Sequence, residues 1–380
     1  MYKFAMMTGV SGKTLSMLVL CALLCLAQAG AQEWSWHTET VDTAASFTSI
    51  AVDHEGNVHL SYVNGGVKYA FRPAGVTKWF TTAVDGSNGF TSIAVDSANN
   101  PYICYTGYEM LKYAHWDGKS WSMQQVAPNS GQIGYSCGIG VAPDGTVHII
   151  WYQLTLAGQG EYYHLKYAVL KNGMWLARTV DFDGETGKWN SLRVDALGVP
   201  HISYSGYRNG EQKYASWNGE GWTVSTVESR MLSKTGADHP GEANSLLIAR
   251  DGGVMLTFMD ENSLRLARRN GGSWSIEKVD TISNDSWFDY KSSLVLDHMG
   301  GIHICYQDAQ RVKHAYWDGK RWQIQVITDA GPPARYPSMA IDRQDRLYIS
   351  YQDPADGSLK VAVGIRNRNP HIPPSTAAKK

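Results

Sequence analysis

Tyrosine and histidine side chains in the central part of this 380-residue chain are candidates for acid–base chemistry. They are Tyr163, His164, His239 and Tyr290, and Arg335 adds a cation. Removing a proton from the carbon next to a carboxylate, as in a uronate sugar, requires a general base and a cation that neutralises the acid group. These residue types could therefore catalyse an elimination reaction on such a sugar.

Carboxylates from the same part of the chain offer hydrolysis as a second chemistry. A glycosidase uses two carboxyl groups about 5–10 Å apart. Candidates for such a pair are Glu161, Asp238, Glu242 and Asp289. The sequence does not give their separations, so elimination and hydrolysis both stay open.

A short acidic segment, DFDGE at 181–185, is a candidate metal site. Asp181, Asp183 and Glu185 place carboxylate oxygens on alternate residues, and calcium prefers hard oxygen ligands of this kind. The segment is shorter than a complete calcium-binding loop. An ordinary acidic turn is the alternative, and calcium is the only cofactor that the sequence suggests.

The elements that must position these residues come from a fourteen-residue phrase that occurs seven times. One copy is SLVLDHMGGIHICY. Successive copies begin 43, 46, 53, 54, 48 and 45 residues apart, which is the length of one propeller blade. The copies begin at Ser49, Ser92, Gly138, Ser191, Ser245, Ser293 and Ser338.

Each copy opens a unit of four predicted strands. The phrase supplies two strands joined by a turn such as Asp144-Gly145, and the second strand is rich in β-branched and aromatic residues. A third strand carries phrases such as LKYA at 111–114, and a tight hairpin such as WDGKSW at 116–121 leads into the fourth. The pattern predicts an all-β fold, a seven-bladed β-propeller of four-stranded antiparallel blades over residues 34–365.

The first blade is preceded by an extra copy of the fourth strand. Six units have a fourth strand that starts with tryptophan, and the segment WSWHTETV at 34–41 has the same pattern. We expect this N-terminal strand to complete the last blade and to close the ring. Closure removes exposed sheet edges, which are the main liability of such a fold.

Residues that recur at the same position of the repeat are interpreted as scaffold. One position holds histidine in four copies, a second holds a basic residue, and a third holds the hairpin tryptophan. We expect them to pack and to form hydrogen bonds or ion pairs, with sugar stacking by the tryptophans as the alternative. They are His59, His148, His201 and His303; Lys68, Lys112, Lys166, Lys213, Arg265, Lys313 and Lys360; and Trp79, Trp121, Trp175, Trp222, Trp274 and Trp322.

Residues just before each copy are the candidates for ligand binding, because they differ between copies. In a propeller this is where the chain reaches the innermost strand, near the mouth of the central channel. Blades one and two carry small or apolar residues there, whereas later blades carry aromatic and charged ones, which predicts one localised site. Together with the loop residue Trp287, the candidates are Tyr135, Lys188, Trp189, Lys291, Arg335 and Tyr336.

Long connections fall in the same half of the chain. They are 153–164, 228–244 and the segment that contains Trp287 and Tyr290. Long loops without structure of their own are uncommon unless they are functional or disordered. Tolerated surface insertions are the alternative.

The series SLxVDxxGxxHISY, LKYAxW and DGxxW resembles the secreted bacterial β-propeller repeats grouped loosely with the sialidase-like, Asp-box superfamily. The resemblance covers residues 34–365 and implies the propeller fold. That architecture carries lectins, glycosidases, polysaccharide lyases and interaction modules. The turn DGKSW at 117–121 differs from a true Asp box, and no arginine triad of a sialidase is visible, which disfavours a sialidase proper.

The two ends of the chain differ from the repeats. Residues 1–31 contain Lys3, Lys13, an apolar run and small-residue cleavage sites, which predicts a cleaved secretory signal and a secreted or periplasmic protein. No other segment is apolar and long enough to span a membrane. Residues 366–380 are rich in proline and predict a disordered tail. The three cysteines after the leader are an odd number and predict no disulfide framework.

These observations predict a secreted propeller that engages a polysaccharide or surface glycan at a single site at its channel mouth. The glycan rests on the resemblance and on the tryptophan and tyrosine content. The formal net charge of −1 and the absence of a basic stripe argue against a nucleic-acid partner. Two alternatives stay open: a non-catalytic scaffold for a protein partner, and a polysaccharide lyase or glycosidase that uses the His/Tyr/Arg set.

Overall fold

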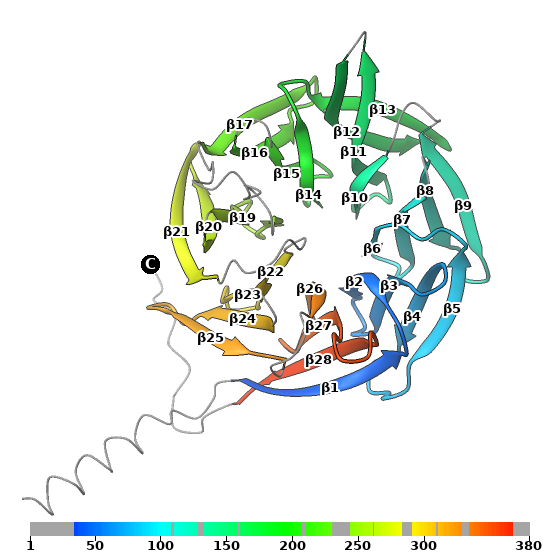
Figure 1. Cartoon of the computed structure of the whole chain (residues 1–380), viewed down its shortest axis with the longest axis vertical. Coiled ribbons are helices and arrows are strands. Elements are labelled where there is room, and N and C mark those ends of the chain that lie inside the picture. The colour runs from blue at the N-terminus through cyan, green and yellow to red at the C-terminus, as the bar shows by residue number, and fades with distance from the viewer. Residues whose placement is uncertain are drawn as a thin grey trace, which may run out of the picture. The chain divides into compact units, whose positions relative to one another are not determined.

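The computed structural model describes residues 34–107, 110–127, 133–157, 160–206, 210–229, 244–260, 262–282, 291–308, 311–328 and 334–367. In this part of the chain, seven four-stranded antiparallel sheets follow one another around a ring (Figure 1). The predicted seven-bladed β-propeller is confirmed. The leader at 1–31 and the tail beyond 367 lie outside the described residues, so the predictions made for them stay predictions.

Each blade runs from an inner strand at the channel to an outer strand at the rim. Blades one to three comprise β2 (Ser46–Val52), β3 (Val58–Val63), β4 (Val67–Arg72) and β5 (Phe80–Asp85); β6 (Thr91–Val95), β7 (Pro101–Gly107), β8 (Met110–Trp116) and β9 (Trp121–Ala127); and β10 (Ile133–Val141), β11 (Val147–Ala157), β12 (Gly160–Lys171) and β13 (Met174–Asp181).

Blades four to seven continue the same order. They comprise β14 (Thr186–Val194), β15 (Pro200–Gly206), β16 (Glu211–Trp217) and β17 (Trp222–Glu228); β18 (Ser245–Ile248), β19 (Val254–Asp260), β20 (Ser263–Asn270) and β21 (Ser273–Thr281); β22 (Ser292–Leu296), β23 (Ile302–Asp308), β24 (Arg311–Trp317) and β25 (Trp322–Val326); and β26 (Arg335–Ile341), β27 (Leu347–Gln352) and β28 (Leu359–Arg366), with β1 (Trp34–Asp42).

Burial explains the composition of the strands. The second strand of a blade is covered on both faces by the neighbouring blades, so every residue of β3 and of β23 is buried. These strands therefore show no alternation of buried and exposed residues, and their polar side chains, such as His59 and His303, are buried with the apolar ones. The fourth strand lies at the rim, and four of the six residues of β5 are exposed. The core therefore lies between the blades.

The ring closes as the sequence predicts. The last sheet has the strand order β1-β28-β27-β26, so the N-terminal strand supplies the outer strand of the blade that the C-terminal strands form. The chain divides by its contacts into residues 36–363, which carry the blades, and a unit that includes 34–35 and 364–367. In the latter, the Ser35 hydroxyl donates to the Asn367 side-chain oxygen at 2.9 Å.

Recurring basic residues join neighbouring blades through a carboxylate. Asp181, at the end of β13, accepts hydrogen bonds from the Tyr204 hydroxyl at 2.8 Å and from the Lys213 ammonium at 3.0 Å, both in the next blade. All three side chains are buried. Two other blade boundaries repeat this arrangement, with Asp42, Tyr62 and Lys68 at one and Asp280, Tyr306 and Lys313 at the other. The predicted scaffold role of these lysines is confirmed.

Recurring histidines and tryptophans are scaffold as well. The buried His148 ring nitrogen Nδ1 lies 2.7 Å from the Tyr167 hydroxyl of its own blade. Trp222, in the next blade, packs edge-on against the same Tyr167 ring, with 4.9 Å between centroids. Trp121 and Tyr69 repeat this contact at 5.2 Å. These hairpin tryptophans are used for packing between blades.

Two of the cysteines lie side by side. The Cys104 sulfur, on β7 of blade two, is 2.9 Å from the Cys137 sulfur, on β10 of blade three. Both are free thiols in this structure. Within the described residues, no helix is both long and apolar enough to cross a lipid bilayer.

Candidate functional site

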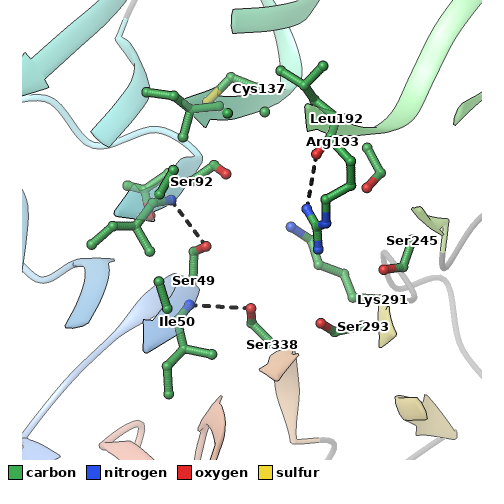
Figure 2. Close-up of a pocket in the computed structure, with 18 of the residues that line it drawn as sticks. Ser49, Ile50, Ser92, Cys137, Leu192, Arg193, Ser245, Lys291, Ser293 and Ser338 are labelled. Atoms are coloured by element: carbon green, nitrogen blue, oxygen red, sulfur yellow. Dashed lines mark hydrogen bonds between the residues drawn. The ribbon is translucent and has the colours of Figure 1, made fainter. Parts of the chain in front are cut away.

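The inner strands surround a cavity of about 490 Å³ along the axis of the ring. Figure 2 shows side chains from different blades facing this space. Its lining runs along the inner strands, from residues near their starts, such as Trp189, to residues at their ends, such as Val52 and Val194, and we call the end where the strands start the mouth. We refer to this space as the channel.

Serines at the start of the repeated phrase join adjacent inner strands. The Ser338 hydroxyl accepts the Ile50 N–H at 3.3 Å, and the Ser49 hydroxyl accepts the Ile93 N–H at 3.2 Å (Figure 2). Ser191 and Ser245 form the same contact with the backbone of the following blade, at 3.1 Å each. The recurring serine is thus explained as a link between blades, although its hydroxyl hydrogen remains able to donate.

Three aromatic residues at one repeat position have an unusual backbone conformation. Phe47, Trp189 and Tyr336 each stand two residues before the repeated phrase, with φ of 53°, 45° and 58°. The strand register is irregular at each of them, as in a β-bulge. A side chain in this left-handed region costs about 1–2 kcal/mol relative to ordinary backbone. Tertiary contacts must therefore hold all three in place.

Hydrogen bonds from neighbouring residues supply those contacts. The Phe47 carbonyl accepts the Thr91 hydroxyl at 2.8 Å, and the Tyr336 carbonyl accepts the Thr48 hydroxyl at 2.8 Å. Beside Trp189, the Asn190 amide donates to the Gly187 carbonyl and to the Ser136 hydroxyl, both at 2.8 Å. The carbonyls of Phe47 and Tyr336 are thereby held by the next blade, which fixes the backbone that carries each aromatic ring.

These rings form two aromatic groups near the mouth. In one group, the Phe47 ring centroid lies 4.1 Å from that of Phe90 and 4.8 Å from that of Tyr336. The Lys291 ammonium of blade six lies 5.5 Å from the Phe90 ring. In the other group, the Lys188 ammonium lies 4.3 Å from the Trp189 ring, within the range of a cation–π contact.

Sequence reasoning placed several of these residues and missed others. The candidates Lys188, Trp189 and Lys291 line the channel, and Arg335 and Tyr336 stand at the start of β26 beside it. The strained Phe47 was not predicted as a site residue. Arg193, which points from β14 into the channel, was not predicted either (Figure 2).

The prediction of a loop at 153–164 is wrong for most of that segment. Strands β11 and β12 extend through it as an antiparallel hairpin, with pairs such as Gln153 with His164 and Leu154 with Tyr163. The antiparallel pairing of β11 and β12 continues without a break to Ala157 and Gly160, so the segment forms backbone hydrogen bonds of a sheet instead of the expected irregular loop. The insertion is an extension of blade three that reaches beyond its neighbours in length (Figure 1).

Tyr163 and His164 lie on opposite faces of this hairpin, because successive strand residues alternate. The Tyr163 ring stacks on Tyr152 at 4.6 Å, and Tyr152 lines the channel and donates to the Glu185 carboxylate at 2.7 Å. The His164 ring lies near Phe182, at 5.9 Å, and burial lowers its pKa below the ordinary value. Tyr163 therefore lies on the face of the hairpin that carries Tyr152, and His164 lies on the opposite face.

The candidate calcium ligands have other partners in this structure. Asp181 and Asp183 both contact the Lys213 ammonium, at 3.0 and 3.1 Å, and Glu185 accepts the Tyr152 hydroxyl. Among the residues that the structure describes, no group of three acidic, histidine or cysteine side chains is placed to hold a metal ion. The donor set is occupied by an ammonium group, so it does not fit a divalent cation.

The remaining candidate site residues, or their side chains, are not among those that the structure describes. Residues 230–243 and 283–290 are not described, and they include His239, Glu242, Trp287 and Tyr290, together with Asp238 and Asp289. Tyr135 belongs to β10, but its side chain is not described. The side chain of Glu161, on β12, is not described either. The roles predicted for these residues stay predictions.

Comparison with solved structures identifies other propellers. A family PL25 polysaccharide lyase, an ulvan lyase bound to -[GlcA(1-4)Rha3S]-, is similar with a TM-score of 0.55 and 12% identity over 86% of this chain and 95% of that chain. The polysaccharide lyase Uly1 gives 0.51 and 11% over 84% and 89%. An arginine-to-alanine mutant of AofleA from Arthrobotrys oligospora gives 0.53 and 12% over 80% and 92%. At these identities the likeness shows the fold alone. No protein-family model and no curated protein matches the chain.

Proposed function

We propose that the chain is a secreted propeller that binds a carbohydrate, a polysaccharide or surface glycan, at the mouth of its channel. The observation that carries this proposal is the set of aromatic residues Phe47, Trp189 and Tyr336 in left-handed backbone conformations at one repeat position. Strained residues of this kind concentrate at ligand sites, where surrounding contacts impose them. Aromatic faces at a cavity mouth are surfaces on which sugar rings stack.

The composition of the mouth supports a polar, flexible ligand. Trp189 stands beside Lys188 and Asn190, and Asn244 and Lys291 line the same opening. A ligand pocket that combines apolar rings with a few polar groups can fix a ligand by stacking and orient it by hydrogen bonds. The names of the similar lyases, which act on polysaccharides, and the predicted secretory leader point in the same direction.

Calorimetric titration of a chain that begins at residue 33 with acidic and neutral oligosaccharides tests the proposal. Trp189→Ala should weaken binding about tenfold, which is the effect of losing one stacking contact of 1–1.5 kcal/mol. The matched control is Phe80→Ala, because Phe80 is an aromatic residue 49% exposed on the outer strand β5. Equal affinities for wild type and Trp189→Ala would refute a stacking site at the mouth.

A polysaccharide lyase is the second candidate, favoured by the position of Tyr163. Its ring stacks on Tyr152, and Tyr152 lines the channel together with Lys188 and Lys291. Incubation with acidic polysaccharides should then give reducing ends together with the ultraviolet absorbance of unsaturated uronates, and Tyr163→Phe should abolish both. Reducing ends without absorbance would indicate a hydrolase. Binding without either product leaves a lectin, and no binding by folded protein favours a scaffold for a protein partner.

A further inference from the structure

Arg193 breaks the repeat pattern inside the channel. It is the third residue of the phrase that begins at Ser191, and the other six copies have small or apolar residues at this position. The side chain of Arg193 points into the cavity, as does that of Lys291 (Figure 2). The equivalent residues are Ala51, Ala94, Gly140, Leu247, Val295 and Ala340.

The guanidinium of Arg193 has no acidic partner among the described residues. Its one hydrogen bond in this part of the chain goes from Nη1 to the Leu192 carbonyl at 3.0 Å. The Arg193 side chain is half-buried among the inner strands, and this partial burial lowers its pKa from the usual value, although an arginine stays protonated at neutral pH. A cation in such surroundings is costly unless an opposite charge compensates it.

The other groups along the channel suit an anion. Lys188 and Lys291 line it together with Arg193, and its lining contains no aspartate or glutamate in the described part of the chain. The hydroxyls of Ser191 and Ser245 accept backbone N–H groups, which leaves their own hydrogens to donate. The small residues that replace arginine in other blades leave space beside the guanidinium.

We infer that the channel is an anion-binding site with Arg193 as its principal ligand. It takes a carboxylate or sulfate group, which a planar guanidinium binds through two parallel N–H donors. The group can belong to a free anion or to an acidic sugar. The acidic sugar rests on the proposed function. In that case the glycan is acidic, and its charged substituent reaches past the aromatic residues at the mouth to Arg193.

Titration of the chain from residue 33 with inorganic sulfate tests the anion site. Wild type should bind sulfate saturably, Arg193→Ala should weaken binding at least tenfold, and Arg193→Lys should retain part of the affinity. The control Arg250→Ala removes an exposed arginine of a turn outside the channel and should leave the affinity unchanged. In sulfate-free buffer, Arg193→Ala should melt no lower than wild type, because it removes an uncompensated cation.

A second titration separates this inference from the proposed function. Uronate oligosaccharides and neutral oligosaccharides of equal length are compared on wild type, Trp189→Ala and Arg193→Ala. Loss of the preference for the acidic sugar in Arg193→Ala alone supports both proposals. Sulfate binding without any sugar binding supports the anion site and refutes the glycan site. Sugar binding that is indifferent to charge overturns the acidic-sugar case, and the absence of saturable sulfate binding by wild type overturns the anion site.

Discussion

Two identical stretches of sequence give a direct measure of backbone strain at the channel mouth. The heptapeptide FTSIAVD occurs at 47–53 and again at 90–96. Phe47 has a φ of 53°, whereas Phe90 is not among the residues with positive φ. Replacing each phenylalanine by glycine and by alanine removes the ring in both cases. The difference between glycine and alanine then isolates the backbone.

The expected difference has opposite signs at the two positions. At Phe47, glycine avoids the cost of a left-handed backbone conformation, about 1–2 kcal/mol for other residues. It loses about 0.5–1 kcal/mol in return, because its backbone gives up more entropy on folding. Phe47→Gly should therefore be more stable than Phe47→Ala by roughly 0.5–1 kcal/mol. Phe90 stands directly before β6 and is not among the residues with positive φ. Phe90→Gly should therefore be less stable than Phe90→Ala by about 0.5–1 kcal/mol, because glycine loses more backbone entropy on folding.

Equilibrium urea unfolding of the four variants, followed by circular dichroism, measures both differences. Lost ring contacts cancel within each pair, including the 4.1 Å contact between Phe47 and Phe90 themselves. A glycine variant that is less stable than its alanine counterpart at both positions would refute the strain, and with it the main support for the site. A sign reversal confirms that the protein holds Phe47 against its own preference.

Three further perturbations test the scaffold. Burial lowers the pKa of His148 from 6.5 to about 4, so between these values the unfolded chain binds a proton that the folded chain excludes, and stability falls as the pH falls. Two other blades carry tyrosine at this position. In urea unfolding, His148→Tyr should therefore reduce the fall in the free energy of unfolding between pH 7 and pH 4.5 by about 2–3 kcal/mol. An unchanged pH dependence of that free energy would contradict the prediction. Lys213→Met should cost about 3 kcal/mol because it leaves a buried carboxylate without its cation, whereas Lys360→Met, whose ammonium is 3.7 Å from its carboxylate, should cost under about 1 kcal/mol; equal losses would be inconsistent with the ion pairs described. Glutathione disulfide should oxidise Cys104 and Cys137, whose sulfurs are 2.9 Å apart, to a disulfide, and the two thiol hydrogens pass to the two reduced glutathiones that form. Thiol titration in denaturant should then find one free cysteine in the mature chain, and finding three would exclude the bond.

The fold was predictable because the sequence states it seven times. Repeat spacing fixes the blade, and an unmatched tryptophan strand at 34–41 indicates closure, which the pairing of β1 with β28 confirms. Scaffold residues followed from the same periodicity, since each blade carries a basic residue, lysine or arginine, at the same position of the repeat. The hairpin extension at 153–164 was missed because alternation in β11 continues beyond the repeated phrase, where no second copy exists for comparison.

The site was less predictable, for a reason that FTSIAVD makes plain. The same seven residues fold differently because their neighbours differ: Gly89 precedes Phe90, and its ideal Cβ position is only 2.2 Å from the Thr106 carbonyl oxygen, whereas Ser46 precedes Phe47. The Thr106 hydroxyl, in turn, accepts the Phe90 N–H at 2.9 Å. Tertiary contacts of this kind decide the conformation, and no local pattern records them.

Arg193, in contrast, could have been identified from the sequence alone, because it departs from the repeat pattern. Comparing the copies singles out residues that differ, and Arg193 differs within the inner strand itself rather than in the loop before it. One arginine among six small or apolar residues at an inward-facing position is a departure that scaffold alone does not explain. A propeller needs its inner strands to pack closely, so a long cation there must either harm the ring or serve a ligand. The melting temperature of Arg193→Ala in sulfate-free buffer and its affinity for sulfate distinguish a packing role from a binding role, because a packing arginine would lower the first and leave the second unchanged.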